Sequence, residues 1–281
     1  MQFQLLTIVG VGLIGGSIGL AAKQRGVARR VRGLGRQRSS LDRALSVGAL
    51  DEAHLDPQAA MTGADLVVFC TPVDQIADQV LTFAKHCEPS ALLTDAGSTK
   101  AAIVEAVETQ LPANGPQFVG SHPLAGSEKR GPEFADARLF EQRWTVVTST
   151  PRTSAAALDR VASFWSALGS KVKTMSPADH DRALALTSHL PHLLAAALAG
   201  ALPAELRDLT ATGFRDTTRI AAGDPRLWTA IFDQNRTPVL EALGRLESRL
   251  HEFRQALESG NNATVDQFLA QAKEVRDALG N

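Results

Sequence analysis

The chain has 281 residues, of which 44% are hydrophobic and 21% are charged, and its formal net charge is −1. This composition is typical of a folded globular protein with a full core, and the length favours two domains. The small net charge removes the general electrostatic case for nucleic acid or an anionic membrane as a partner. Cys70 and Cys87 are not spaced as a disulfide scaffold or a zinc site, and they fit a reducing cytoplasm.

The first apolar stretch is long enough for a membrane helix, because residues 5–22 carry no charge. A membrane span or a signal peptide is one interpretation, and the spacing of Gly12 and Gly16 would suit helix pairing in a membrane. Five glycines, Thr7 and Ser17 dilute this stretch, however, and no basic residue precedes it. The same glycines fit a nucleotide-binding turn better, so we expect no membrane association.

Up to about residue 176, short apolar runs alternate with longer amphipathic stretches, the pattern of βαβ units on a parallel sheet. The predicted strands are residues 4–9, 30–34, 66–70, 91–94, 117–120, 145–148 and 171–174. The predicted helices on the faces of the sheet are residues 17–25, 40–47, 76–86, 100–108 and 154–168. We therefore predict an α/β Rossmann-type, doubly wound domain over residues 1–176.

Beyond residue 176 the apolar patterns have a helical period, which predicts an all-α C-terminal domain over residues 177–281. One long helix is expected from Pro225, with Asp224 as its cap, to a stop at Gly260, and a last helix follows it. Both helices have long apolar faces. These faces indicate a homodimer formed through the helical domain, although packing onto the first domain would also cover them.

Gly10, Gly12 and Gly15 form a GxGxxG pattern directly after the first predicted strand and at the start of a helix. In this setting the pattern is typical of a dinucleotide-binding turn. Gly10 permits the tight turn, Gly12 lets the backbone approach a pyrophosphate, and Gly15 allows the helix to pack closely on the sheet. Leu13 and Ile14 complete the turn, where free N–H groups of the helix bind the anion. A glycine-rich turn without a ligand is the alternative.

The residues after the second predicted strand favour NADP over NAD. NAD-binding domains have an acidic residue roughly twenty residues beyond the turn, where it binds the adenosine ribose 2′-hydroxyl. Here that position is Gly35, and Arg36, Arg38 and Ser39 follow it. These side chains can form charge-assisted hydrogen bonds with a 2′-phosphate. Solvated arginines on an NAD-binding domain are the alternative. The other predicted cofactor-binding residues are Thr71 and Pro72, which follow the third strand.

Five later segments are more specific than the nucleotide turn. They are residues 95–100, 120–128, 179–181, 188–192 and 213–221, and they include His-Pro-Leu-Ala-Gly at 122–126 and Phe-Arg-Asp-Thr-Thr-Arg at 214–219. Together they resemble the prephenate/arogenate dehydrogenase family over about residues 5 to 250. The resemblance implies an oxidoreductase that oxidatively decarboxylates a cyclohexadienyl acid on the route to tyrosine.

The resemblance gives His122 and Ser98 catalytic roles. In the family, ring C4 of the substrate loses a hydride to the nicotinamide, its hydroxyl loses a proton, and the ring carboxylate leaves as CO2. A neutral imidazole suits that proton because its ordinary pKa is about 6.5, so His122 is the predicted base. Ser98 matches the family serine that binds the same hydroxyl and orients the histidine. Taken alone, Ser98 also suits the cap of a helix that starts at Thr99.

Arg219 matches the family's substrate-binding arginine, and its planar guanidinium can bind a carboxylate through two hydrogen bonds. Arg215, four residues earlier, is a weaker candidate because an ion pair with Asp216 would also explain it. Trp228 matches a family position where it would shape the substrate pocket. A lone aromatic residue on a helix is also a common core residue, so both interpretations stand.

His180, Ser188 and His192 match family positions around the substrate. They lie on one predicted helix, in which Pro191 removes a backbone hydrogen bond and predicts a kink. The spacing of His189 and His192 would suit a metal, but no third ligand has a suitable context, so no metal is predicted.

Glu128 bears on the choice of substrate, since the resemblance puts it in a polar network at the mouth of the pocket. Arogenate carries an ammonium where prephenate has a keto oxygen, and a nearby carboxylate favours the ammonium. We therefore expect the protein to use both acids with a slight preference for arogenate.

Two other kinds of protein share part of this pattern. A two-domain NADP enzyme such as a β-hydroxyacid dehydrogenase or an imine reductase has the same turn, but it usually relies on a lysine in the helical domain. A non-catalytic NADP sensor would have no need of His122, Ser98 and Arg219 together. The predicted function is thus that of a cytoplasmic, homodimeric, NADP-dependent prephenate or arogenate dehydrogenase.

Overall fold

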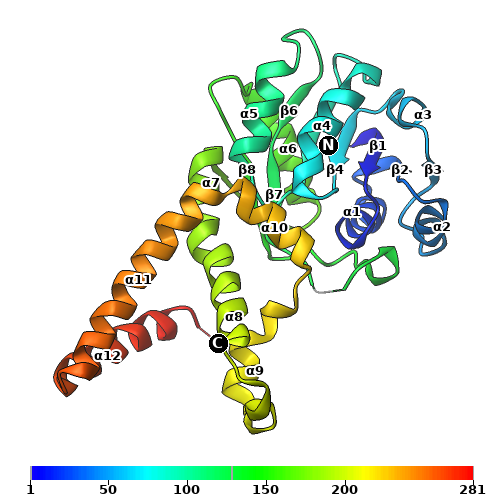
Figure 1. The fold of residues 1–281 in the computed structure, drawn as a ribbon. Helices are drawn as coiled ribbons and strands as arrows, with labels where there is room; N and C mark the ends of the chain where they lie inside the picture. The colour runs from blue at the N-terminus through cyan, green and yellow to red at the C-terminus, as the bar shows by residue number, and fades with distance from the viewer. Residues whose placement is uncertain (1, 128, 281) are drawn as a thin grey trace. The chain divides into compact units, whose positions relative to one another are not determined.

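The computed structural model describes residues 2–127 and 129–280, which divide into two compact units, one up to residue 235 and one from residue 236. The first unit contains a six-stranded parallel sheet in the order β3-β2-β1-β4-β5-β6 (Figure 1). The strands are β1 (Phe3–Val9), β2 (Ala28–Leu34), β3 (Glu52–His54), β4 (Leu66–Phe69), β5 (Leu92–Asp95) and β6 (Gln117–Val119). The order reverses between β1 and β4, and open α/β sheets bind ligands beyond the carboxyl ends of strands at such a point.

Helices cover both faces of this sheet. They are α1 (Leu13–Gln24), α2 (Arg38–Ser46), α3 (Pro57–Met61), α4 (Val73–Phe83), α5 (Ala101–Gln110) and α6 (Ala155–Ala167). Side chains alternate along β1, so Leu6 and Ile8 belong to one buried apolar cluster, while Leu5 and Val9 belong to another. The first cluster includes residues of α1, α2 and α6, and the second includes residues of α3, α4 and α5. The predicted doubly wound fold is confirmed.

The strands after residue 120 form a second, three-stranded sheet, which the sequence did not predict. β7 (Ser121–Pro123) pairs antiparallel with β8 (Trp144–Thr148), and β8 pairs parallel with β9 (Lys171–Met175). The chain changes sheets at Gly120, whose carbonyl accepts the N–H of Thr148 at 2.8 Å. A Cβ at Gly120 would lie 2.7 Å from the Thr148 hydroxyl, so glycine allows this close approach. The change of sheet leaves His122 directly after the carboxyl end of β6.

From residue 177 to residue 280 the structure contains helices and turns, as predicted. The segments are α7 (Pro177–Leu184), a π-helical segment η3 (Ala185–His189), α8 (Leu190–Gly200), η4 (Ala204–Leu209), α9 (Thr212–Thr218), η5 (Arg219–Ala222), α10 (Pro225–Gln234), α11 (Arg236–Glu258) and α12 (Asn262–Ala278). A π-helical segment widens the helix just before Pro191, the residue at which a kink was predicted.

The single long helix predicted after Asp224 is wrong, because the structure divides it at Asn235 into α10 and α11. Asp224 does cap α10, since its side chain accepts the Arg226 N–H at 2.9 Å. Asn235 then leaves the helical conformation, with φ −110° and ψ 29°, and its side chain donates to the Asp181 carbonyl at 2.8 Å. Pro238 reinforces the break, because its ring would disrupt a continuous helix but is tolerated in the first turn of α11.

The second unit consists of α11 and α12, which pack on each other through aromatic side chains. The rings of Phe253 and Phe268 have centroids 4.9 Å apart, and the Arg249 guanidinium lies 4.3 Å from the centre of the Phe268 ring. Gly260 adopts a φ of 65° directly after α11. The stop predicted at this glycine is confirmed.

The apolar stretch at residues 5–22 is divided between β1, the following turn and α1, and most of it is buried in the first unit. A different helical stretch, Pro177–Gly200, has the length and apolar composition of a membrane span, which by itself is weak support for one. The buried polar residues of that stretch include His180, Asp181 and His189. Their hydrogen bonds to other elements of the first unit tie the stretch into the protein.

Candidate active site

The predicted nucleotide turn lies at the carboxyl end of β1, where the strand order reverses. Gly10 has a φ of +88°, a conformation that favours glycine, and its N–H donates to the Leu34 carbonyl at 2.9 Å. A Cβ on Gly15 would lie 2.4 Å from the Gly10 carbonyl oxygen, so α1 can begin this close only with glycine. A Cβ on Gly12 would meet nothing within 4 Å. The backbone of Gly12 is therefore open to a close-lying ligand such as a pyrophosphate.

The other residues predicted to bind the cofactor surround this turn. Leu13 and Ile14 form the half-buried first turn of α1. The Thr71 methyl group lies 2.8 Å from the position that a Gly10 Cβ would take, and the Thr71 hydroxyl donates to Gln79 Oε1 at 2.7 Å. Pro72 is exposed at the start of α4. These contacts bring the ends of β1 and β4 together at the predicted crevice.

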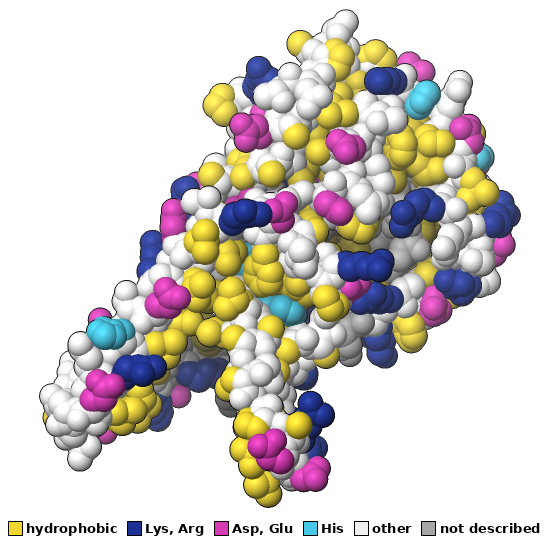
Figure 2. Space-filling view, viewed as in Figure 1, with side chains coloured by type: hydrophobic (Ala, Val, Ile, Leu, Met, Phe, Trp, Pro, Cys, Tyr) yellow, Lys and Arg dark blue, Asp and Glu magenta, His cyan; other side chains and the backbone are white. Residues whose placement is uncertain are grey.

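The basic residues predicted to bind a 2′-phosphate lie at the end of β2 and the start of α2. Arg36 and Ser39 are exposed, and Arg38 forms an exposed ion pair with Asp42 at 2.8 Å. Figure 2 shows basic side chains on the side of the unit where α1 and α2 lie. The residues present fit a dinucleotide with an additional phosphate, which would compete with Asp42 for Arg38.

A chain of polar side chains holds His122. Its Nδ1 lies 2.9 Å from Nε2 of His180, and Nδ1 of His180 lies 2.7 Å from Oδ1 of Asp181. The Asp181 carboxylate also accepts the backbone N–H groups of Lys100 and Ala101, at 2.8 and 2.9 Å. No side chain of its own segment caps α5, so the carboxylate of α7 caps it from outside. The arrangement joins α5, α7 and β7 at one point.

Ser98 is not the cap of α5, and this local prediction is wrong. The helix begins at Ala101, with Lys100 as the preceding residue, and Asp181 supplies the cap from a distant part of the chain. Ser98 is half-buried in the loop between β5 and α5. That loop lies at the carboxyl edge of the parallel sheet, the same edge as the nucleotide turn, and the catalytic role of Ser98 stays a prediction.

A buried ion pair between Lys100 and Asp95 adjoins His122. Neither side chain is exposed, and the ammonium contacts Asp95 Oδ2 directly. Asp95 also accepts the N–H groups of Gly97 and Ser121, each at 2.9 Å. Burial lowers the pKa of Lys100, and the neighbouring Asp95 charge opposes that change. Each charge is therefore compensated by its partner, and Asp95 additionally by two backbone donors.

The histidines of the site are neutral at physiological pH. Burial lowers the pKa of His122 well below its ordinary value of 6.5, and the nearby His180 and the Lys100 ammonium lower it further. Burial also lowers the pKa of His180, against the opposing effect of Asp181. The pKa of His189 falls to about 4, again mainly through burial. A neutral His122 is able to accept a proton, as a general base must.

His192 and Trp228 form a second part of the site. Their rings are stacked, with centroids 3.4 Å apart and planes 15° apart. Gly223 makes room for them, since a Cβ there would lie 2.6 Å from Trp228 Nε1. His189 approaches the Trp228 ring edge-on, and its Nδ1 lies 2.9 Å from the Asn235 side-chain nitrogen. Because Asn235 also binds the Asp181 carbonyl, this part of the site connects with the His122 chain.

Two further predicted substrate-binding residues, Arg219 and Ser188, lie on segments next to this network. Arg219 begins η5, which packs against α8, and its side chain is exposed and accessible to a carboxylate. Ser188 is half-buried in the π-helical segment, next to His189. Glu128 lies outside the described residues. His122, His180, His192 and Trp228 are thus brought together, while Arg219 and Ser188 lie on neighbouring segments.

Four polar residues of the network were assigned no role by the sequence analysis: Asp95, Lys100, Asp181 and Asn235. The first three lie within segments that resemble the family, and this resemblance could have marked them as candidate site residues. Their importance depends on burial and on contacts between distant segments, which a local pattern does not reveal. Nothing in the sequence around Asn235 marked it.

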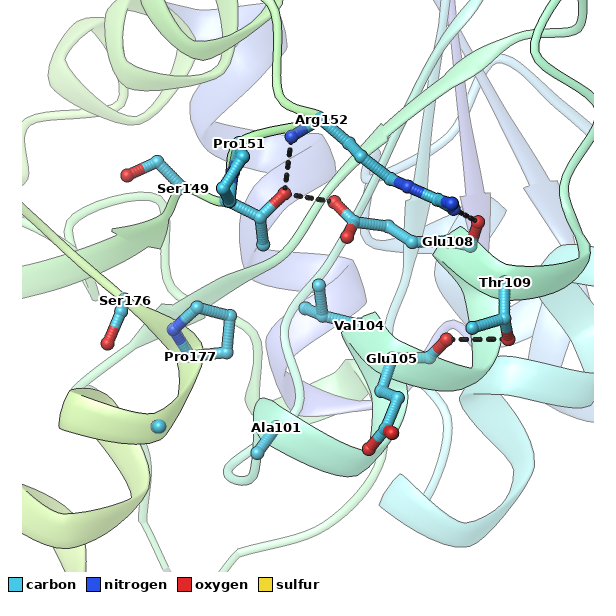
Figure 3. Close-up of a pocket in the computed structure, with 12 residues that line it drawn as sticks. Ala101, Val104, Glu105, Glu108, Thr109, Ser149, Pro151, Arg152, Ser176 and Pro177 are labelled. Atoms are coloured by element: carbon cyan, nitrogen blue, oxygen red, sulfur yellow. Dashed lines mark hydrogen bonds between the residues drawn. The ribbon is translucent and has the colours of Figure 1, made fainter.

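A cavity of about 370 Å³ lies between α5, the loop after β8 and the start of α7 (Figure 3). Thr150 donates to the Glu108 carboxylate at 2.6 Å, and the Arg152 guanidinium donates to the Glu108 carbonyl. None of the predicted catalytic, substrate-binding or cofactor-binding residues that the structure describes lines this cavity. We therefore do not regard it as the active site.

Known proteins match the chain over nearly its whole length. Residues 18–174 match the family model of the prephenate dehydrogenase nucleotide-binding domain, and residues 176–274 match that of the prephenate dehydrogenase dimerization domain. The cyclohexadienyl dehydrogenase of Zymomonas mobilis is 32% identical, over 99% of this chain and 96% of the relative.

Solved structures give the same result. Prephenate dehydrogenase from Aquifex aeolicus, in complex with hydroxyphenyl propionate and NAD+, superposes with a TM-score of 0.92 at 30% identity, covering 99% of both chains. Synechocystis arogenate dehydrogenase has a TM-score of 0.84 at 30% identity, covering 98% of this chain and 100% of the other. The resemblance read from the sequence is confirmed, and the chain belongs to the prephenate/arogenate dehydrogenase family of oxidoreductases.

Proposed function

We propose that the protein oxidatively decarboxylates prephenate and arogenate with NADP+, in the biosynthesis of tyrosine. The observation that carries this proposal is the neutral, hydrogen-bonded His122 directly after the carboxyl end of β6. It lies at the sheet edge that also carries the nucleotide turn and Ser98. The activities named for the relatives above support the same reaction class.

Different residues of the chain have different roles in this reaction. When bound, the dinucleotide supplies the hydride acceptor, and the turn at Gly10 to Gly15 with the N-terminus of α1 would hold its pyrophosphate. His122 accepts the proton of the ring hydroxyl, and Ser98 binds the same oxygen. Arg219 binds a substrate carboxylate through its two-pronged guanidinium. With both the hydroxyl and a carboxylate held, the ring is oriented for loss of its hydride and of CO2.

The stacked His192 and Trp228 rings would form an aromatic wall of the substrate pocket. A flat apolar surface suits the cyclohexadienyl ring, and the half-buried Trp228 also packs on the apolar cluster that includes Ile231. His180 and Ser188 complete the set of proposed substrate-site residues. His180 is fully buried and contacts His122, so its effect on substrate passes through that residue.

The preference for NADP is inferred from Arg36 and Arg38 of this chain. The Aquifex relative does not support it, since that structure contains NAD+. Replacing both arginines with alanine is expected to weaken NADP+ binding by about 10- to 100-fold, since each loses a charge-assisted hydrogen bond to the 2′-phosphate. NAD+ binding, measured in parallel by calorimetry, should change little. Arg30→Ala is the matched control, because Arg30 is an exposed arginine of β2 paired with Glu52. An equal loss for both dinucleotides would contradict the assignment.

The reaction itself is tested by steady-state oxidation of arogenate and prephenate, each with NADP+ and with NAD+. We expect turnover of both acids with NADP+, and a slightly higher kcat/KM for arogenate because the Glu128 carboxylate attracts its ammonium group. A prephenate kcat/KM far above that of arogenate would rule out this preference. Absence of turnover in all four combinations would refute the dehydrogenase assignment.

We also propose that the protein is a cytoplasmic homodimer. The family model for residues 176–274 is described as a dimerization domain, and exposed apolar side chains occur within each unit of this chain. In the first unit they include Leu194 and Leu198 of α8, and Figure 2 shows hydrophobic side chains on the surface where α8 and α9 lie. Light scattering at micromolar concentration is expected to give twice the mass of one chain, and a monomer would contradict the proposal.

A further inference from the structure

The hydrogen bonds behind His122 define which of its nitrogens carries the proton. We propose that Asp181 and His180 are positioning residues that hold the proton of neutral His122 on Nδ1, so that the lone pair of Nε2 is presented to the substrate hydroxyl. The tautomer is a property of the protein without substrate. Its catalytic consequence rests on the proposed function.

The Asp181 carboxylate determines which nitrogen of His180 is protonated. A carboxylate offers only lone pairs, and Asp181 uses them to accept the N–H groups of Lys100 and Ala101 at the start of α5. The same Oδ1 atom lies 2.7 Å from His180 Nδ1. The hydrogen of that bond must therefore come from His180, whose Nδ1 is protonated.

His180 is fully buried and neutral. A neutral imidazole has one N–H, and Asp181 already requires it on Nδ1, so Nε2 of His180 is an acceptor. This Nε2 lies 2.9 Å from His122 Nδ1. His122 must then donate through Nδ1, and its Nε2 is left with a lone pair.

In the reaction, the proton of the substrate hydroxyl moves to His122. The O–H bond of the substrate hydroxyl breaks, an N–H bond forms at His122 Nε2, and the hydroxyl electron pair forms the new carbonyl as C4 gives up its hydride, for which a bound NADP+ would be the acceptor. The ring carboxylate would leave as CO2, and its bonding electrons would convert the dienone into an aromatic phenolate. The resulting imidazolium keeps its Nδ1–H bond to His180. The Asp181 carboxylate, one ring further away, stabilises the positive charge through that ring.

The carboxylate is well fixed, because three hydrogen bonds from two other segments restrain Asp181. Two backbone donors of α5 hold its oxygens, and the Asn235 side chain holds its carbonyl at 2.8 Å. Rotation of Asp181 to release His180 would leave the buried N–H group of Lys100 and the part-buried one of Ala101 without this acceptor. The hydrogen bonds that cap α5 therefore fix Asp181, and Asp181 acts through His180 to keep the proton of His122 on Nδ1.

A direct test reads the tautomer by long-range 1H–15N NMR on protein labelled with 15N-histidine, without substrate. The His122 signals are identified by their loss in His122→Asn, and His86→Phe serves as a control because His86 is exposed in a surface turn. We expect the Nδ1 of His122 to be protonated and its Nε2 to be unprotonated at neutral pH. A protonated Nε2 in the wild-type protein would overturn the proposal.

The functional test compares two replacements of His180. Phenylalanine keeps the ring but has no acceptor, while glutamine has one acceptor and one donor, like the neutral imidazole. For His180→Phe we expect kcat to fall by about 10- to 100-fold, the usual effect of losing a hydrogen bond to a charged group, with KM nearly unchanged. His180→Gln should recover much of this loss. Equal kcat values in the two variants, at equal thermal stability, would indicate a merely structural His180 and would overturn the proposal.

The two tests separate the failure of this inference from the failure of the proposed function. If the wild-type protein oxidises neither acid while Nδ1 of His122 is protonated, the proposed function fails and the hydrogen-bond assignment stands. If the wild-type protein turns over and both His180 variants retain full kcat, the function stands and the positioning role is refuted.

Discussion

Replacing His122 with asparagine is expected to lower kcat by about 10²- to 10⁴-fold, the usual contribution of a general base, while NADP+ binding stays unchanged. The asparagine amide can still donate to His180 Nε2, so the hydrogen-bond chain to Asp181 is preserved. The variant lacks a basic nitrogen for the substrate proton. The loss should therefore appear in kcat and in kcat/KM alike, as for a group that acts in the transition state.

This result is measured by steady-state kinetics with both acids and by calorimetric titration of NADP+. His86→Asn is the matched control, since it removes an exposed histidine that is not part of the network. A kcat within a few-fold of the wild-type value for His122→Asn would show that another group takes the proton. A large loss of NADP+ affinity would instead place His122 in the cofactor site.

The second large effect concerns stability, and we expect Lys100→Met to lower the free energy of unfolding by about 3–5 kcal/mol. Methionine has a similar length but no charge, so Asp95 would remain fully buried without its ammonium partner. The two backbone N–H groups that Asp95 also accepts offset only part of that cost. Because proteins are stable by only about 5–15 kcal/mol, this change would remove a large share of the total.

Urea unfolding followed by far-UV circular dichroism measures this difference. Lys23→Met is the matched control, because Lys23 pairs with Asp51 at 2.5 Å with both side chains about one third exposed (33% and 35%). Such surface pairs contribute roughly 0–1 kcal/mol, so the control should unfold close to the wild type. Equal losses of unfolding free energy in the two variants would show that Lys100 does not compensate the buried charge of Asp95.

The parts of the fold that could be predicted are those set by neighbours in sequence. Alternating and helical apolar patterns identified most strands and helices of the parallel sheet, and Gly10, Gly12 and Gly15 identified the turn. Asp224 and Gly260 marked a helix start and a helix stop through local capping chemistry. In each case the deciding interactions lie within a few residues along the chain.

The features that escaped prediction depend on distant partners. The start of α5 is set by Asp181, 80 and 81 residues away from the amides that it caps, so Ser98 was mistaken for the cap. Asn235 ends α10 while bonded to Asp181, 54 residues earlier, and the apolar period of the helix continues past it without a signal. Likewise, His180 was predicted to bind substrate. Its full burial and its contact with His122, which no local pattern reveals, indicate that it acts on the substrate through His122.

Because Asp181 caps α5, formation of the α5 N-terminus during folding is coupled to the orientation of the catalytic groups. The first turn of α5 gains its acceptor only when α7 has docked, and that docking brings His180 against His122. A molecule with a fully formed α5 N-terminus therefore has a fully oriented His122 as well. The amide hydrogens of Lys100 and Ala101 exchange with solvent only when this contact opens, so their exchange rates report how often the catalytic histidine loses its support.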